Sequence, residues 1–216
     1  MEFKIIENFF NESLYNELKS FFLSEMCIWT LNSKIIAHDS SDYFDKEINI
    51  NLIEEKLIED EIYYTNNNFN LNHFYNYQFV CPLYNINTKT KIHTNNDMKN
   101  IFYKIINSKE LQDLNISKIL RIKANIANYC GKDLYHHNFH TDININKYKN
   151  DNKENFKTLV IYFNTCNGYT LIKKYNEKIY SKDNRCLLFN TYLEHLGTNT
   201  TNDKFRLVLN INYIQK

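Results

Sequence analysis

The chain has 216 residues, 43% of them hydrophobic, which predicts one globular domain over residues 1–216 with a sizeable core. Its 26 basic residues nearly balance its 25 acidic residues, which disfavours a nucleic-acid partner. Five widely spaced cysteines without a CxxC pair argue against a disulfide framework and a structural zinc site, and favour the reducing cytoplasm. We expect no signal peptide, because the N-terminus mixes charged and apolar residues, and no membrane span, because no uncharged apolar run approaches about 18 residues.

The N-terminal half is predicted to be helical. Residues 8–25 carry apolar side chains at helical spacing, and Asn11 can cap the first turn. Similar spacing predicts helices over residues 51–60 and 97–107. The aromatic, irregular stretch 73–87 between them predicts a strand and a loop, which either pack on the core or border a substrate groove.

The hydrophobic pattern changes after residue 117. Leu120, Ile122, Ala124 and Ile126 alternate with polar residues, which is the period of a strand. Short β-rich runs follow at 159–163, 178–180, 186–189 and 205–213, separated by turn residues. Many short strands at close spacing predict a sandwich or barrel after the helical half. Asn125 and Thr158 would share one region of it, although a register slip by one residue would turn either side chain away.

The segment with the clearest chemistry is His140-Thr141-Asp142. On a strand, the first and third of these side chains would point to the same face. His195 lies later in the same β-rich half, and two histidines with one carboxylate make the facial triad that binds non-heme iron(II). The plain alternative is that His140 is a polar rim residue and Asp142 starts a turn. Of the neighbouring pair at 136–137, at most one histidine could join the site, and we expect a loop histidine near its entrance.

Arg206 lies on the last predicted strand, between Phe205 and Leu207. Because side chains alternate along a strand, Arg206 faces away from the apolar row that contains these two residues. An arginine inside a small barrel is costly unless it meets an anion. A dicarboxylate could supply that anion through a bidentate pair.

Residues 118–214 resemble the prolyl-hydroxylase branch of the 2-oxoglutarate and iron(II) dependent oxygenases, in the type that phages encode. The resemblance follows a series of motifs in order: Asn128-Tyr129-Cys130-Gly131, Tyr135, the HxD at 140–142, Thr158 to Asn164, Asn167-Gly168-Tyr169-Thr170, Asn184 to Phe189, His195 and Arg206. It implies an α+β fold: a double-stranded β-helix core, also called jelly-roll or cupin-like, over 118–216, with N-terminal buttressing helices in 1–117.

The resemblance also implies roles for particular residues. His140, Asp142 and His195 would bind Fe(II), and Arg206 with Tyr162 would bind the distal carboxylate of 2-oxoglutarate. Tyr129 would line the co-substrate pocket. For Tyr162 an ordinary strand aromatic is an equal alternative, and for Tyr129 a core tyrosine is slightly favoured.

The implied reaction is hydroxylation of a C–H bond, with a prolyl residue of a peptide or protein as first candidate. It would consume 2-oxoglutarate and O2 and form succinate and CO2, with ascorbate as a candidate reductant. A phage-encoded enzyme of this type would work in the host cytoplasm. Three alternatives stay open: the same chemistry on a small molecule or nucleobase, a zinc hydrolase with the same ligands, and a non-catalytic jelly-roll metal-binding module. The last would not need an anion receptor behind a metal.

Overall fold

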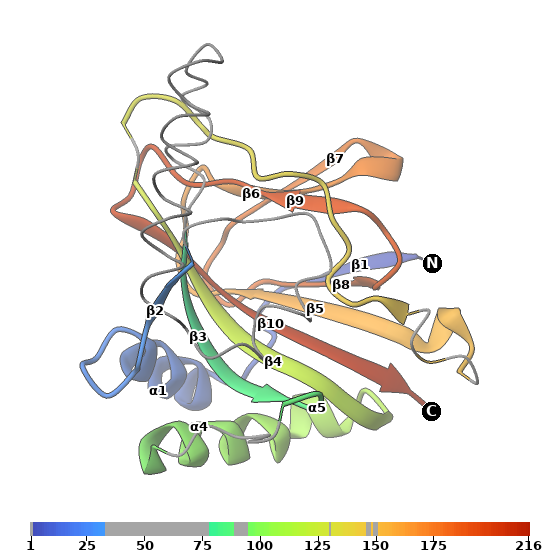
Figure 1. The fold of residues 1–216 in the computed structure, drawn as a ribbon. Helices are drawn as coiled ribbons and strands as arrows, with labels where there is room; N and C mark the ends of the chain where they lie inside the picture. Colours follow the sequence, from blue (N-terminus) through green and yellow to red (C-terminus); the bar gives the residue numbers. More distant parts are fainter. Residues whose placement is uncertain (1, 33–77, 89–94, 130, 146–147, 149–150) are drawn as a thin grey trace, which may run out of the picture.

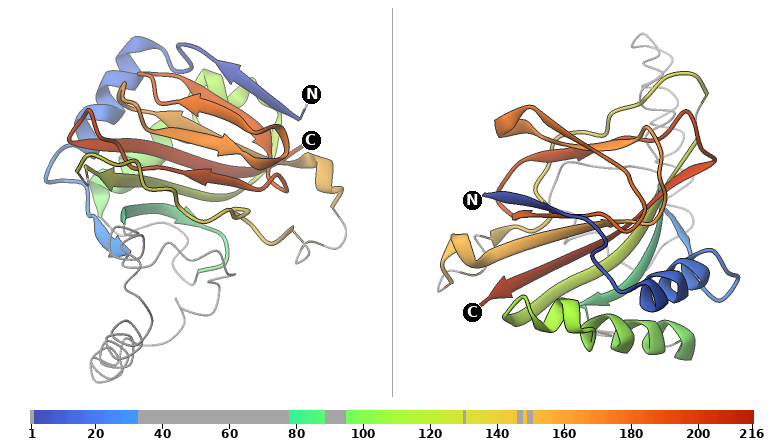
Figure 2. Two further views of the ribbon diagram at one scale, coloured as in Figure 1. Left: turned by 90° about the horizontal axis from the view of Figure 1, so that it is seen from above. Right: turned by 180° about the vertical axis from the view of Figure 1, so that it is seen from behind.

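Two antiparallel β-sheets face each other in the computed structural model, which describes residues 2–32, 78–88, 95–129, 131–145, 148 and 151–216 (Figure 1). The larger sheet has the strand order β1-β8-β5-β10-β4-β3-β2, and the smaller has the order β7-β6-β9. The strands are β1 Phe3–Ile6, β2 Thr30–Asn32, β3 Gln78–Asn85, β4 Ile116–Asn128, β5 Phe156–Tyr162, β6 Tyr169–Ile172, β7 Glu177–Tyr180, β8 Cys186–Asn190, β9 His195–Gly197 and β10 Phe205–Gln215. The space between the sheets forms the inside of the barrel, as the view from behind shows (Figure 2).

The helices α1 Glu12–Phe22, α4 Asn96–Ile106 and α5 Lys109–Gln112 lie on the outer side of the larger sheet (Figure 1). The helix predicted over 8–25 is observed as α1, and the side chain of Asn11 accepts the backbone N–H of Leu14 at 3.0 Å. The helix predicted over 97–107 is observed as α4, which Asn95 caps in the same way. The helix predicted over 51–60 lies outside the described residues. No helix in the described ranges is long and apolar enough to cross a membrane.

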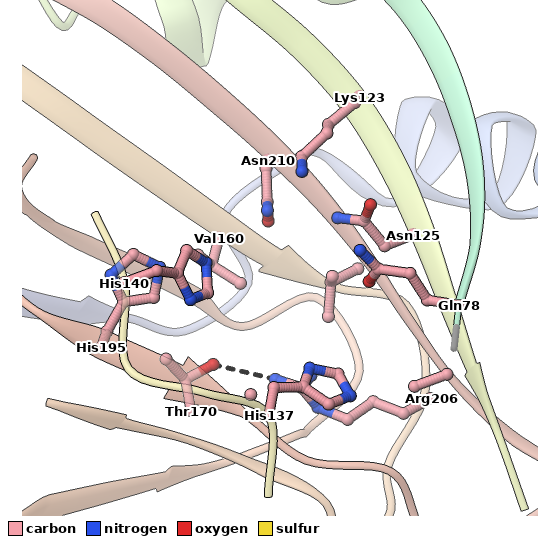
Figure 3. Close-up of a pocket in the computed structure, with 13 residues that line it drawn as sticks. Gln78, Lys123, Asn125, His137, His140, Val160, Thr170, His195, Arg206 and Asn210 are labelled. Carbon is pink, nitrogen blue, oxygen red and sulfur yellow. Dashed lines mark hydrogen bonds between the residues drawn. The ribbon is translucent and has the colours of Figure 1, made fainter. Parts of the chain in front are cut away.

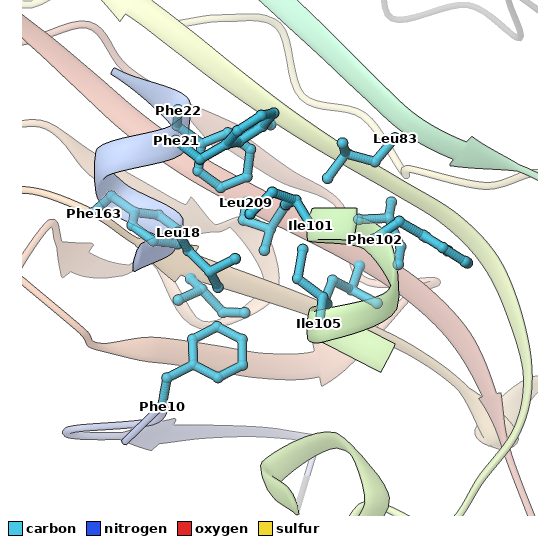
Figure 4. Packing of buried hydrophobic residues seen from close by; sticks show 14 of the residues in the cluster. Phe10, Leu18, Phe21, Phe22, Leu83, Ile101, Phe102, Ile105, Phe163 and Leu209 are labelled. Atoms are coloured by element: carbon cyan, nitrogen blue, oxygen red, sulfur yellow. The ribbon is translucent and has the colours of Figure 1, made fainter. Parts of the chain in front are cut away.

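The largest hydrophobic core lies between these helices and the larger sheet (Figure 4). Leu207, Leu209 and Ile211 of β10 belong to it and are fully buried. Successive side chains of a strand point to opposite faces, so the residues between these three face the inside of the barrel. The alternation that predicted the strands therefore also sorts apolar side chains toward the helices and polar ones toward the interior.

The pairing of β10 with β4 arranges the inward-facing residues in four successive rungs. Arg206 pairs with Ala127, Val208 with Asn125, Asn210 with Lys123, and Asn212 with Arg121. On the other side of β10, Asn212 also pairs with Thr158 of β5. This register gives the barrel a polar wall that runs from Arg206, at the start of β10, to Arg121 of β4.

Candidate functional site

Three potential metal ligands converge at one end of this polar wall. One ligand atom from each of His140, Asp142 and His195 lies within 4.8 Å of the others. The Nε2 atom of His195 is 3.7 Å from Oδ2 of Asp142, and the two imidazole ring centroids are 4.6 Å apart. The three side chains that the sequence singled out are therefore close enough to share one ion.

The backbone that carries these ligands differs from the predicted strand. His140 and Asp142 lie in the long connection between β4 and β5, outside the named strands. His140 forms a single bridge with His195, in which each backbone N–H donates to the other residue's carbonyl at 3.0 Å. The prediction that strand alternation aligns His140 with Asp142 is wrong, because a loop paired to β9 aligns them instead.

Both histidines are oriented by their Nδ1 atoms. Nδ1 of His140 lies 2.9 Å from the carbonyl of Asn138, and Nδ1 of His195 lies 3.1 Å from the carbonyl of Leu193. A carbonyl only accepts, so each Nδ1 carries the proton and each Nε2 presents a lone pair. Burial lowers the pKa of His195 to about 4, although Asp142 opposes this shift, so the imidazole is neutral near pH 7. A neutral imidazole is the form that binds a metal.

Asp142 is held by two residues of the larger sheet. Arg121 of β4 donates from Nη2 to Oδ1 at 2.7 Å, and Asn212 of β10 donates from Nδ2 to Oδ2 at 3.2 Å. Burial, the largest single effect, would raise the pKa of Asp142, but the nearby positive charges, with Arg121 first among them, together outweigh it and hold the pKa below its usual range. The carboxylate is therefore ionised and fixed in position.

Arg206 lies at the other end of the wall and is 4% exposed. Its Nε donates to Ser181 Oγ at 2.8 Å and its Nη2 donates to Thr170 Oγ1 at 2.8 Å. The guanidinium carbon lies 5.3 Å from the ring centroid of Tyr162. Among the described residues, no carboxylate pairs with this buried cation. A buried guanidinium with neutral partners alone could act as a receptor for an anion.

His140, His195 and Arg206 line one pocket between the sheets, which is partly open to solvent (Figure 3). Other lining residues were not predicted as site residues: Gln78, Lys123, His137, Thr170 and Asn210. The strand alternation contained the signal for Lys123 and Asn210, because both lie in the polar row.

His137 is buried beside Arg206, whereas we expected a loop histidine near the entrance. A Cβ added at Gly197 would lie 3.2 Å from Nη1 of Arg206 and 3.4 Å from Nδ1 of His137. Burial and the charge of Arg206 lower the pKa of His137 to about 3. Its neighbour His136 is exposed and hydrogen-bonds the hydroxyl of Tyr169 at 2.6 Å. As expected for adjacent residues, only one of the pair faces inward.

The two predicted co-substrate tyrosines do not line the pocket. Tyr162 is fully buried and donates its hydroxyl to Thr170 Oγ1 at 2.9 Å, so it contacts the residue that also accepts from Arg206. Tyr129 is 50% exposed, and its backbone N–H bonds to the carbonyl of Lys204. Asn125 is buried and lines the pocket, while Thr158 is buried and accepts from Asn212.

Solved structures share this fold. HygX from Streptomyces hygroscopicus with nickel and 2-oxoglutarate bound matches with a TM-score of 0.56 and 9% identity, over 100% of this chain and 83% of that one. The same protein with iron bound matches with a TM-score of 0.50 and 9% identity, over 100% and 82%. A prolyl hydroxylase from Trichoplax adhaerens, in complex with a hypoxia inducible factor peptide fragment, matches with a TM-score of 0.52 and 12% identity, over 99% and 84%. The chain shares the fold of these proteins. The two facing antiparallel sheets match the predicted jelly-roll core.

No family model matches the chain, and no curated protein matches its sequence. The identities above are low, so the likeness concerns the fold, and the chemistry must be argued from the side chains. The donor set of two imidazoles and a carboxylate fits iron(II), and the unpaired Arg206 fits a diacid.

Proposed function

We propose that this chain is an iron(II)- and 2-oxoglutarate-dependent dioxygenase that hydroxylates a C–H bond. One observation carries the proposal: the cluster of three potential metal ligands and a buried arginine, which has no carboxylate partner among the described residues, serve the same pocket. A metal-storing module or a zinc hydrolase would account for the ligands but not for Arg206.

In this proposal, His140, His195 and Asp142 hold the iron through Nε2, Nε2 and Oδ2. Arg206 pairs with the distal carboxylate of 2-oxoglutarate, and Thr170 helps to orient the guanidinium. Tyr162 does not contact the co-substrate in this proposal. It supports the site indirectly, through its hydrogen bond to Thr170. When bound, iron with 2-oxoglutarate and O2 supplies the oxidant for the C–H bond, with succinate and CO2 as products. The barrel walls orient the co-substrate and limit the access of water.

The first candidate substrate is a prolyl residue of a peptide or protein. The order of motifs from Asn128 to Arg206 supports it, and so does the fold shared with the prolyl hydroxylase that binds a peptide. Mass spectrometry of proline-containing peptides after incubation with iron, ascorbate, 2-oxoglutarate and O2 tests it: a gain of one oxygen is expected. The phage-type affiliation and a place in the host cytoplasm stay predictions from the sequence.

The reaction class is tested by succinate formation with iron, 2-oxoglutarate and O2. The wild-type chain is expected to form succinate, and His140→Ala to lose this activity while its circular dichroism spectrum is retained, because one ligand of the ion is gone. Arg206→Met is expected to weaken 2-oxoglutarate binding by at least about tenfold, the share of a charge-assisted hydrogen bond. His136→Ala, at an exposed neighbour outside the triad, is the matched control.

Succinate formation by His140→Ala at the wild-type rate would refute the assignment of the metal ligands. A protein that binds iron but never consumes 2-oxoglutarate would instead be a metal-binding module. Hydrolysis by a zinc-loaded protein that needs neither O2 nor 2-oxoglutarate would establish the hydrolase alternative.

A further inference from the structure

The pocket contains a second cation that the proposed function does not use. Lys123 faces inward from β4, where it pairs with Asn210 of β10. Its ammonium makes no hydrogen bond or ion pair within the described part of the chain. Burial and the charge of Arg121 together lower the pKa of Lys123 to about 8, although Asp142 opposes this shift. The lysine is thus a partly buried cation that lacks a direct partner.

Lys123 and Arg206 enter the barrel at separate places. Arg206 of β10 pairs with Ala127 of β4, and Lys123 lies four residues from Ala127 along β4. The backbone positions that carry the two cations are therefore about 13 Å apart in the strand direction. The rung beyond Lys123 contains Arg121 and Asn212, which hold Asp142. Lys123 therefore lies next to the metal end of the pocket, whereas Arg206 lies at the far end.

The negative charges expected near Lys123 are already paired with other groups. The carboxylate of Asp142 is bonded to Arg121, and it would also bind the metal. The distal carboxylate of 2-oxoglutarate would neutralise Arg206. An ammonium left unpaired in a pocket that is only partly open to solvent is costly, so its natural partner is an anion that arrives with the substrate.

Two asparagines beside Lys123 also carry side-chain oxygens that have no hydrogen-bond partner among the described residues. Asn125 is 5% exposed and Asn210 is 9% exposed, and the side-chain oxygen of each is buried without a hydrogen bond. Figure 3 shows Lys123, Asn125 and Asn210 grouped on one wall, across the pocket from His140 and His195. Buried amides of this kind are satisfied in nearly all proteins, so their open acceptors indicate an N–H donor on a ligand. A carboxylate with a neighbouring N–H matches the lysine and the asparagines together.

We infer that this wall binds the head group of an amino-acid substrate, with its free α-carboxylate on Lys123 and its amine N–H on the side-chain oxygens of Asn125 and Asn210. The inference rests on the proposed function. Within it, the wall favours the small-molecule alternative, a free amino acid with proline among the candidates, over a prolyl residue of a peptide or protein. The reactive side chain would then extend across the pocket toward the metal ligands. A prolyl residue inside a peptide, which lacks both the free carboxylate and the N–H, would not use this wall.

The test compares the binding of common amino acids with that of their C-terminal amides, which differ only in the charged group. The protein is held with iron and 2-oxoglutarate but without O2, and affinities are measured by calorimetry. At least one amino acid is expected to bind at least about tenfold more tightly than its amide, as a lost charge-assisted hydrogen bond implies. Lys123→Met and Lys123→Gln should remove this preference and leave the affinity for 2-oxoglutarate unchanged. Lys118→Met, at an exposed lysine of the same strand, should retain the preference.

Three outcomes would overturn the inference: no amino acid binds better than its amide, the preference persists without Lys123, or the Lys123 variants weaken 2-oxoglutarate as strongly as Arg206→Met does. The last outcome would show that Lys123 binds 2-oxoglutarate and not the substrate. The titration is repeated without metal and 2-oxoglutarate, where the wall is still present. Failure of the wild type to consume 2-oxoglutarate would refute the proposed function alone, since the preference for carboxylates is measured without turnover.

Discussion

At the scale of single residues, Gly168 explains how Arg206 fits into the barrel. A Cβ at this position would lie 2.5 Å from the carbonyl oxygen of Asn199 and 2.6 Å from Cδ of Arg206. Neither distance is tolerated, and the first neighbour is backbone. At Gly197 an added Cβ would meet the guanidinium at 3.2 Å, a milder contact with the end of a flexible side chain. The turn glycine at 168 is therefore required for close approach.

We expect Gly168→Ala to displace Arg206 and to weaken 2-oxoglutarate binding by about tenfold or more, because the guanidinium loses its alignment with the diacid. Iron affinity should stay unchanged, since no metal ligand moves. Calorimetric titration of each ligand measures both effects. Gly197→Ala provides a graded comparison with a smaller loss, and equal 2-oxoglutarate affinity in wild type and Gly168→Ala would contradict the steric explanation.

At the scale of elements, the helices stabilise the sheet that supports the site without reaching the pocket. Ile105 of α4 is fully buried in the core between the helix and the larger sheet, on the face opposite the barrel interior (Figure 4). The same helix exposes Asn100 to solvent. The larger sheet therefore has its hydrophobic core on the face that packs against the helices, and the pocket residues on the opposite face.

Ile105→Ala is expected to lower the free energy of unfolding by about 2–5 kcal/mol, because it removes buried methyl and methylene groups and leaves a cavity. Activity per folded molecule should be retained. Urea unfolding measures the first quantity and succinate formation the second. Asn100→Ala should change stability by less than about 0.5 kcal/mol. A loss at Ile105 no larger than at Asn100 would mean that α4 does not pack as described.

Strong periodicity made elements predictable, and short elements without it were missed. The helices α1 and α4 and the long strands β4 and β10 follow from their apolar spacing, and β5 follows from a continuous run of β-branched and aromatic residues. The three-residue strand β9 and the four-residue strands β1 and β6 are too short to show a period. The loop position of His140 was missed for the same reason: a single bridge to His195 has no sequence pattern.

For the site, the types and order of residues in the sequence predict the three candidate metal ligands and Arg206. The partners of Asp142, Arg121 and Asn212, depend on a register between strands far apart in the sequence. That register also decides that Lys123 faces Asn210. Periodicity along one strand cannot provide it.

At the scale of the whole molecule, the barrel interior holds neutral histidines. The pKa of His137 is lowered to about 3 from a usual value near 6.5, so the unfolded chain binds its proton at a higher pH than the folded chain does. Below pH 6.5 each unit of acidification therefore favours unfolding, and above it the contribution is constant.

Between pH 6.5 and pH 5, the metal-free protein is expected to lose stability with a slope that rises from about 0.7 toward about 1.4 kcal/mol per pH unit for such a histidine, because the unfolded chain is half protonated at pH 6.5. His137→Gln should show a shallower pH dependence than wild type, whereas His136→Gln, at the exposed neighbour, should follow wild type. Urea unfolding at several pH values measures the slopes. Identical slopes in wild type and His137→Gln would show that the folded protein protonates this residue normally.

The two sides of the metal cluster come from different layers of the barrel. Asp142 is bonded to Arg121 and Asn212 in the larger sheet, while His195 belongs to β9 in the smaller one. An ion that joins them would act as a clamp across the barrel mouth. Removing the ion would allow the two sheets to separate transiently more often. Amide hydrogen exchange in the smaller sheet would then accelerate, even at residues far from the metal ligands.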